Sequence, residues 1–312
     1  MGLAASLSGL DATRSNKDAC AGRAKRTVVV VAVLLSLTVA TGLAAGRVGA
    51  GPAGVQAIRG LSYRTVGGQR LRLDAYLHGS GGLAHPAVVI VHGGGWRSGT
   101  RAAFAPGEVS VELTARLFAA RGWATFSIDY RLAPQSRFPA QLSDVLSALA
   151  WVRRHHSRFR VDPDRVALLG ASAGGNLAAL AALTAPHGAR VVAAVSWSGP
   201  MDLTTFYTAL TSRGSRPFVV DYLGCAPAAC AARYRNASPI VHVTRTSPPI
   251  LLANSTSEIV PLDQAREMAS ALQAHNIAYA LVVVSGSRHA ADYEPAVIDR
   301  TIRFLAVSFG SR

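Results

Sequence analysis

The run Val166-Ala167-Leu168-Leu169-Gly170-Ala171-Ser172-Ala173-Gly174-Gly175-Asn176-Leu177 places a serine between two different structural signals. The apolar residues before Gly170 indicate a buried strand, and the Ala/Leu-rich residues after Ser172 indicate a helix. The Gly-x-Ser-x-Gly turn that joins them is strained, so only small residues fit around it. Such a turn leaves the hydroxyl exposed at the top of a sheet, and we therefore interpret Ser172 as a nucleophile.

A second glycine-rich motif follows an earlier strand. Residues 87–91 are apolar and mostly β-branched, which indicates a buried strand, and His92-Gly93-Gly94-Gly95-Trp96 comes directly after them. Acyl transfer passes through a tetrahedral oxyanion, which needs N–H donors held about 3 Å away. Glycines at a strand end let backbone N–H groups approach a substrate with no side chain between. We interpret this loop as a source of such donors.

Strands and helices alternate along most of the chain. Two alternating runs, 61–66 and 70–77, flank Gly67-Gly68 and predict a hairpin. Further strands are expected at 87–91, 124–128, 166–169, 191–197, 249–253 and 280–284, and helices at 109–121, 139–155, after Ser172, at 262–276 and at 292–309. Residues 200–243 look irregular. The alternation predicts an α/β fold with a mostly parallel sheet and helices on both faces.

Three motifs together resemble the α/β-hydrolase fold, and within it the bacterial esterases of the hormone-sensitive-lipase-like and carboxylesterase type. The motifs that carry the resemblance are His92-Gly93-Gly94-Gly95-Trp96, Asp129-Tyr130-Arg131-Leu132-Ala133-Pro134 and Gly170-Ala171-Ser172-Ala173-Gly174-Gly175. The resemblance covers roughly residues 60–308. It implies a serine hydrolase that acts on carboxylic esters, and it implies that residues 200–243 form part of a lid or pocket wall.

A serine hydroxyl is a weak nucleophile at neutral pH and needs a base, which in turn needs an orienting acid. In this fold the chain order is serine, acid, histidine, and His289 follows the last strand, where the family places its base. The resemblance implies an Asp in the loop after residues 250–253, four residues before Pro261, where this chain has Ser257. We predict that its neighbour Glu258 is the acid, because Glu is one methylene longer and can serve from a shifted position. The alternatives to Glu258 are Asp263, Asp202 or a site with no charged third member.

The resemblance also assigns the oxyanion donors to the backbone N–H groups of Gly94, Gly95 and Ala173. The last of these is the residue after the nucleophile, as the mechanism requires. His92 and Trp96 are expected to shape the glycine loop rather than to take part in the chemistry.

The charges of Asp129-Tyr130-Arg131 and Asp144 are expected to tie loops together near the site. The sequence contains no dinucleotide fingerprint, phosphate-binding loop or metal-ligand cluster, so no cofactor and no metal are implied. The expected partner is a small-molecule ester.

The chain has 312 residues, of which 50% are hydrophobic, and a formal net charge of +15. This length suits one large α/β domain and a leader. The basic residues are scattered arginines with no run of five or six like charges, and Lys17 and Lys25 both lie in the leader. We therefore expect no nucleic-acid partner and favour loose attraction to an anionic cell surface.

The N-terminal region predicts export. Residues 1–26 are basic, residues 27–45 are almost wholly apolar and end in small residues, and this order is typical of a signal peptide or a membrane anchor. The basic side should stay in the cytoplasm, so the following part is expected outside, secreted or anchored to the membrane. Residues 46–58 are interpreted as a linker and residues 59–312 as the hydrolase domain.

Cysteine usage agrees with export. Cys225 and Cys230 would close a short loop, and in an oxidising compartment their spacing indicates a local disulfide. Two other functions compete with ester hydrolysis. One is an amidase, arylformamidase-like or peptidase-like hydrolase. The other is a catalytically inactive hydrolase fold kept as a binding module, an alternative that rests on Ser257 in place of the expected Asp.

Overall fold

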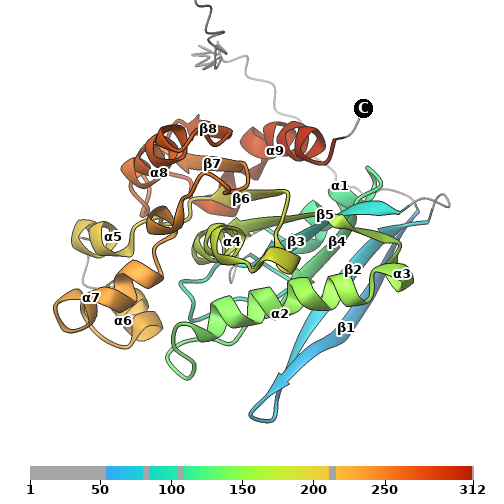
Figure 1. Cartoon of the computed structure of the whole chain (residues 1–312), viewed down its shortest axis with the longest axis horizontal. Helices are drawn as coiled ribbons and strands as arrows, with labels where there is room; N and C mark the ends of the chain where they lie inside the picture. The colour runs from blue at the N-terminus through green and yellow to red at the C-terminus, as the bar shows by residue number, and fades with distance from the viewer. Residues whose placement is uncertain (1–53, 80–83, 105–108, 211–215, 311–312) are drawn as a thin grey trace, which may run out of the picture. The chain divides into compact units, whose positions relative to one another are not determined.

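The centre of the molecule is an eight-stranded sheet (Figure 1) in a computed structural model that describes residues 54–79, 84–104, 109–210 and 216–310. The strands are β1 (Val55–Val66), β2 (Gln69–His78), β3 (His85–Val91), β4 (Ala124–Ile128), β5 (Val161–Ala171), β6 (Ala193–Trp197), β7 (Ile250–Ser255) and β8 (Tyr279–Val284). Their order across the sheet is β1-β2-β4-β3-β5-β6-β7-β8. β2 is antiparallel to both β1 and β4, and all other pairs are parallel.

Helices cover both faces of this sheet (Figure 1). They are α1 (Val111–Ala119), α2 (Ala140–Arg154), α3 (His156–Phe159), α4 (Ala173–Thr184), α5 (Leu203–Ala209), α6 (Arg216–Leu223), α7 (Pro227–Asn236), α8 (Leu262–Ala274) and α9 (Glu294–Ser308). Short 3₁₀ turns are η1 (His187–Ala189), η2 (Pro239–His242) and η3 (Ala290–Tyr293).

The buried side chains of the central strands alternate between two hydrophobic clusters. Val89 and Leu168 belong to the cluster that includes residues of α2, α4 and α8, and Val88 and Leu169 belong to the one that includes residues of α1 and α9. Successive side chains of a strand point to opposite faces, so each central strand must be apolar on both. The continuous apolar runs that predicted these strands have this origin.

The predicted α/β fold is confirmed, with two local differences. β1 begins at Val55, inside the stretch expected to be linker, because residues from Val55 onward pair with β2 up to His78. Residues 200–243 are helical rather than irregular and contain α5, α6, α7 and η2. These helices are short and carry several prolines and glycines between them, so no long apolar period marks them in the sequence.

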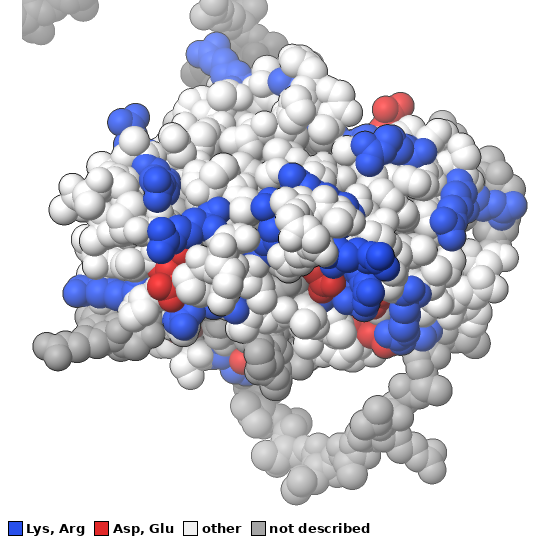
Figure 2. All heavy atoms as spheres, turned by 90° about the horizontal axis from the view of Figure 1, so that it is seen from below, with Lys and Arg blue, Asp and Glu red and all other residues white. Residues whose placement is uncertain are grey.

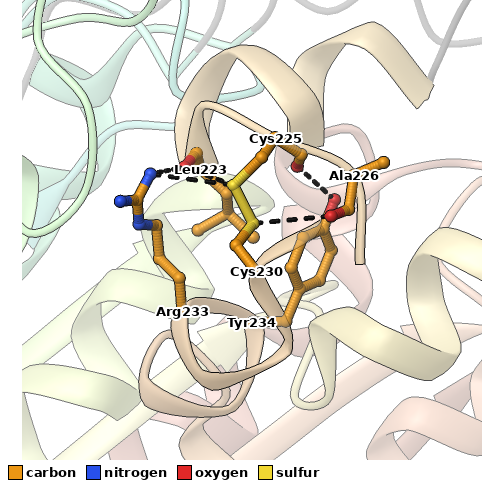
Figure 3. Close-up of a disulfide and its surroundings, with 6 residues drawn as sticks. All are labelled: Leu223, Cys225, Ala226, Cys230, Arg233 and Tyr234. Atoms are coloured by element: carbon orange, nitrogen blue, oxygen red, sulfur yellow. Dashed lines mark hydrogen bonds between the residues drawn. A yellow bond between two sulfur atoms is a disulfide. The ribbon is translucent and has the colours of Figure 1, made fainter. Parts of the chain in front are cut away.

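A disulfide joins Cys225, in the turn after α6, to Cys230 in α7 (Figure 3), as their spacing predicts. The Tyr234 hydroxyl donates to the Cys225 carbonyl at 3.1 Å, and the Arg233 guanidinium donates to the Leu223 carbonyl at 2.5 Å. The bridge and these two bonds hold the end of α6 against α7.

The apolar segment 27–45 lies outside the described residues. Within residues 54–310 as described, no helix combines the length and hydropathy needed to cross a membrane. Figure 2 shows one face of the molecule, on which Arg side chains are spread among uncharged residues and are more frequent than acidic ones. The basic character of the sequence is therefore distributed over this face rather than gathered in one run.

A buried carboxylate links β1, α2 and the loop after β4. The Asp144 side chain has no exposed surface and accepts from Arg64 Nη1 at 2.7 Å and from Arg131 Nε at 2.8 Å. It also accepts from the backbone N–H of Arg131 at 3.0 Å. The expectation that Asp144 and Arg131 tie loops together agrees with these contacts.

Replacing Asp144 with Asn should lower the free energy of unfolding by about 3 kcal/mol. The amide NH₂ would face N–H donors of Arg131, and two guanidinium groups would lose their buried counter-charge. Urea denaturation followed by fluorescence measures the change. The matched control is Asp263→Asn, whose pair with Arg266 leaves the Asp side chain 72% exposed and should contribute less than about 1 kcal/mol. Equal effects of the two substitutions would contradict this interpretation of the network.

Candidate active site

Ser172 stands at the turn between β5 and α4, with φ 53° and ψ −120°. This is a conformation that non-glycine residues rarely adopt. The turn is possible because Gly170 and Gly174 flank it: a side chain on Gly170 would collide with the Gly174 carbonyl, and one on Gly174 would collide with the carbonyls that end β3. The Ser172 N–H donates to the Trp197 carbonyl at 2.7 Å, which fixes the turn against β6.

The glycine loop after β3 lies beside this turn. A Cβ added to Gly93 would be 3.3 Å from the Cβ of Ser172. Among the described residues, the N–H groups of Gly94, Gly95 and Ala173 donate to no protein acceptor. Ala173 is the first residue of α4, and helix N-termini favour negative charge. The three donors predicted from the sequence are thus free to bind an anionic oxygen.

The structure brings Ser172, His289 and Glu258 together in that order. The Ser172 hydroxyl lies 2.9 Å from Nε2 of His289, and Nδ1 of His289 hydrogen-bonds to the Glu258 carboxylate. A carboxylate only accepts, so Nδ1 carries the proton and Nε2 offers a lone pair to the hydroxyl. The Glu258 side chain is fully buried, whereas that of His289 is 22% exposed. The arrangement can move a proton from a serine to an imidazole.

The alternative acids are engaged elsewhere. Asp202 caps the N-terminus of α5 and accepts from the N–H of Thr204 at 2.8 Å. Asp263 pairs with Arg266 at 3.2 Å on the surface. Of the carboxylates considered from the sequence, Glu258 alone reaches His289.

His92 and Tyr130 pack against each other at the start of the glycine loop. Their rings stack with centroids 4.1 Å apart, and the Tyr130 hydroxyl donates to the carbonyls of His92 and Gly93 at 3.1 and 3.0 Å. Burial lowers the pKa of His92 to about 4, so its imidazole is neutral at pH 7. Asp129 accepts from Arg101 Nη1 at 2.8 Å and from the Arg101 N–H at 2.9 Å. These residues shape loops, as expected.

Helix α6 of the insertion packs on the glycine loop. A Cβ on Gly95 would lie 3.2 Å from the ring of Phe218, and the Trp96 and Tyr222 rings stack with centroids 4.4 Å apart. Arg97 in the same loop pairs with Asp221 at 3.1 Å, and its guanidinium lies 5.1 Å from the Phe218 ring centroid. Helix α6 of the insertion therefore lines one side of the glycine loop, which carries the candidate donors Gly94 and Gly95.

Two residues near Glu258 were not foreseen from the sequence. The Ser198 hydroxyl donates to Glu258 Oε1 at 2.8 Å and lies 2.6 Å from the Tyr293 hydroxyl. Ser198 directly follows β6, and this place at the carboxyl end of a parallel strand is the sequence feature that could have identified it as a site residue. Within the described ranges, no cluster of His, Cys, Asp and Glu is arranged to hold a metal ion.

Comparison with protein families and curated proteins places the site in context. The BD-FAE family model matches residues 73–272. Esterase LipC of Mycobacterium tuberculosis is 36% identical over 206 residues, which cover 61% of this chain and 48% of LipC. Esterase LipQ of the same organism is 31% identical over 258 residues, 74% of this chain and 57% of LipQ. The chain spans about half the length of these curated relatives.

Solved structures share the fold. A truncated carbohydrate esterase from gut microbiota superposes with a TM-score of 0.72 at 22% identity, covering 84% of this chain and 100% of that one. Esterase 2 of Thermogutta terrifontis, phosphonylated by sarin, gives a TM-score of 0.68 at 23% identity and covers 82% of this chain and 95% of its own. At these identities the likeness establishes the α/β-hydrolase fold.

Proposed function

Because this chain belongs to the BD-FAE family and has the α/β-hydrolase fold, we propose that it is a serine carboxylesterase that works through an acyl-enzyme. The observation that carries the proposal is the hydrogen-bonded chain from Ser172 through His289 to Glu258. Curated relatives named as esterases support ester hydrolysis as the reaction.

In the first half-reaction, Ser172 Oγ attacks the carbonyl carbon of the ester while its proton passes to Nε2 of His289. The carbonyl oxygen becomes an oxyanion, which the N–H groups of Gly94, Gly95 and Ala173 bind. The intermediate collapses when the C–O bond to the alcohol breaks, and the alcohol takes the proton from His289. The product at this stage is Ser172 esterified with the acyl group.

In the second half-reaction, water attacks the acyl carbon and gives its proton to His289. Collapse of the second tetrahedral intermediate releases the carboxylic acid and returns the proton to Ser172. Glu258 holds the imidazole by Nδ1 in both halves and balances the charge of the imidazolium. Every proton and electron pair is accounted for by these three side chains and water, so the chemistry calls for no cofactor.

Relatives suggest where a substrate search should begin. One solved neighbour is named a carbohydrate esterase, and another is an acetyl ester-xyloside bifunctional hydrolase from Caldicellulosiruptor lactoaceticus. The ring of Phe218 stands beside Gly95 and limits the space next to the oxyanion donors. We therefore propose short acyl esters, acetyl esters first, as the substrates to test.

Replacing Ser172 with Ala should abolish cleavage of p-nitrophenyl acetate and labelling by a fluorophosphonate probe, because the alanine has no oxygen to form either covalent bond. Hydrolysis is followed by absorbance and labelling by gel fluorescence. The neutral control is Asp263→Asn, which removes an exposed carboxylate that pairs with Arg266 and does not contact His289. Wild-type protein that neither hydrolyses the ester nor labels would refute the proposed function, and faster cleavage of a matched anilide would favour an amidase instead.

Glu258→Gln should lower kcat by several orders of magnitude, up to ~10⁴, the effect of the equivalent change in a serine protease triad. The amide can present N–H toward Nδ1, which favours the wrong imidazole tautomer, and it carries no charge for the imidazolium. Steady-state kinetics with p-nitrophenyl acetate measure the loss. Asp202→Asn serves as the comparison, since that residue only caps α5. A loss of less than tenfold in Glu258→Gln would show that another group orients His289.

We further propose that residues 27–45 export the hydrolase domain. The apolar run behind a basic flank and the disulfide between Cys225 and Cys230 support this location. Intact bacterial cells that produce the full chain should expose it to added protease, whereas a variant without residues 1–45 should be protected inside. Equal protection of the two proteins would contradict export.

A further inference from the structure

Glu258 is a buried carboxylate, and each of its oxygens has a different set of partners. Oε2 bonds to Nδ1 of His289, and the side chain has no exposed surface. Oε1 accepts from three donors: Ser198 Oγ at 2.8 Å, Asn254 Nδ2 at 3.0 Å and the Ser255 N–H at 2.7 Å. A buried charge is stable only where such donors replace its hydration. The donors to Oε1 therefore decide where the carboxylate points.

Ser198 differs from the other donors in what else its side-chain oxygen contacts. The same Oγ accepts from the N–H of Ala290 at 2.9 Å, and Ala290 directly follows His289. Asn254 Nδ2, by contrast, makes its second bond to Val260, within the loop that carries Glu258. Ser255 also reaches both parts, but through two different atoms: its N–H donates to Glu258 and its Oγ donates to the Arg288 carbonyl. Ser198 connects the loop of the base to the carboxylate through a single oxygen, so that oxygen helps to set their separation.

Tyr293 also contacts the Ser198 hydroxyl. Its oxygen lies 2.6 Å from Ser198 Oγ and 2.7 Å from the Ala253 carbonyl at the end of β7. Ser198 has one proton, which goes to Glu258 because a carboxylate only accepts, and its Oγ accepts from the Ala290 N–H. Tyr293 also has one proton, which is shared between Ser198 Oγ and the Ala253 carbonyl. Burial raises the pKa of Tyr293 well above 10, and its hydroxyl therefore remains a donor.

The backbone at Ser198 would suit glycine better than serine. Its φ is 52°, in the left-handed region, and its N–H donates to the Ala253 carbonyl at 2.8 Å. Glycine would adopt this conformation without strain but would leave Glu258 Oε1 and the Ala290 N–H one partner short. A Ser198→Gly substitution therefore removes the hydroxyl without adding backbone strain, so its effect reports on the hydroxyl rather than on the backbone.

We propose that Ser198, supported by Tyr293, is a positioning residue that fixes Glu258 against His289. The hydroxyl clamps the acid and the loop of the base to the end of β6, and so keeps Nε2 of His289 aimed at Ser172. This inference rests on the proposed ester hydrolysis for its kinetic consequences and on the described contacts for its geometry.

Ser198→Gly and Ser198→Ala should each lower kcat for p-nitrophenyl acetate by about tenfold or more, with KM changed less than about twofold, because one bond that orients the base is lost. The acidic limb of the kcat/KM profile should move to higher pH by roughly several tenths of a pH unit. The reason is that a carboxylate with fewer hydrogen-bond donors stabilises the protonated imidazole more strongly. Tyr293→Phe should have a smaller effect in the same direction. The reason is that loss of the Tyr293 hydroxyl leaves the hydrogen bond from Ser198 to Glu258 in place.

Ser196→Ala is the matched control. Ser196 is a buried serine of β6, two residues before Ser198, and its Oγ has no hydrogen-bond partner in the described part of the chain. Its removal should leave kcat and the pH profile unchanged, so a general effect of deleting a hydroxyl from β6 would be visible.

Proton NMR of the imidazole Nδ1–H gives a readout that does not depend on activity. The hydrogen bond from His289 to Glu258 should give a far-downfield resonance in wild type and in Ser196→Ala, displaced or broadened in both Ser198 variants. An unchanged resonance together with kcat within twofold of wild type in Ser198→Gly would overturn the inference. If wild-type protein hydrolyses no ester, the proposed function fails, and the resonance still decides whether Ser198 positions the pair.

Discussion

The backbone of Ser172 is held at φ 53°, and the surrounding architecture follows from the space that this conformation requires. The helix that begins one residue later must pass so close to β5 and β3 that Gly170 and Gly174 admit no side chain. The same close approach places the end of β3, and with it the glycine loop, next to the nucleophile. One strained residue thus brings a helix N-terminus, a serine hydroxyl and free N–H groups to a single edge of the sheet.

A second constraint is electrostatic. The candidate acid is fully buried, and a buried carboxylate needs its hydrogen bonds satisfied by the protein. The ends of three parallel strands meet this need: Ser198 follows β6, Asn254 and Ser255 end β7, and His289 lies in the loop after β8. Parallel strands place their carboxyl ends on one edge, which is why residues from distant parts of the chain can surround one carboxylate.

Sequence patterns predicted the parts of this arrangement that depend on local chemistry. The apolar run before Gly170 and the glycines around Ser172 predict the strand-to-helix turn that carries the nucleophile. The position of His289 after the last strand predicts the base. Ser198 and Tyr293 escaped prediction because a single serine or tyrosine has no periodicity, and their meaning arises only when residues 60 and 95 positions apart in sequence touch. The helices of the insertion escaped for a different reason, since their buried faces are too short to show a clear period.

The choice of glutamate at position 258 follows from the register of its loop. The N–H groups of Thr256 and Ser257 donate to the carbonyls of Val284 and Gly286, which ties this stretch to the end of β8 and leaves Ser257 exposed. The carboxylate that turns inward therefore comes one residue later than position 257, where the family resemblance led us to expect Asp. From there the side chain must reach Nδ1 of His289 with one oxygen and three donors with the other. Aspartate at 258 would be one methylene too short for that span, so the longer side chain of Glu258 is what lets this position serve as the acid.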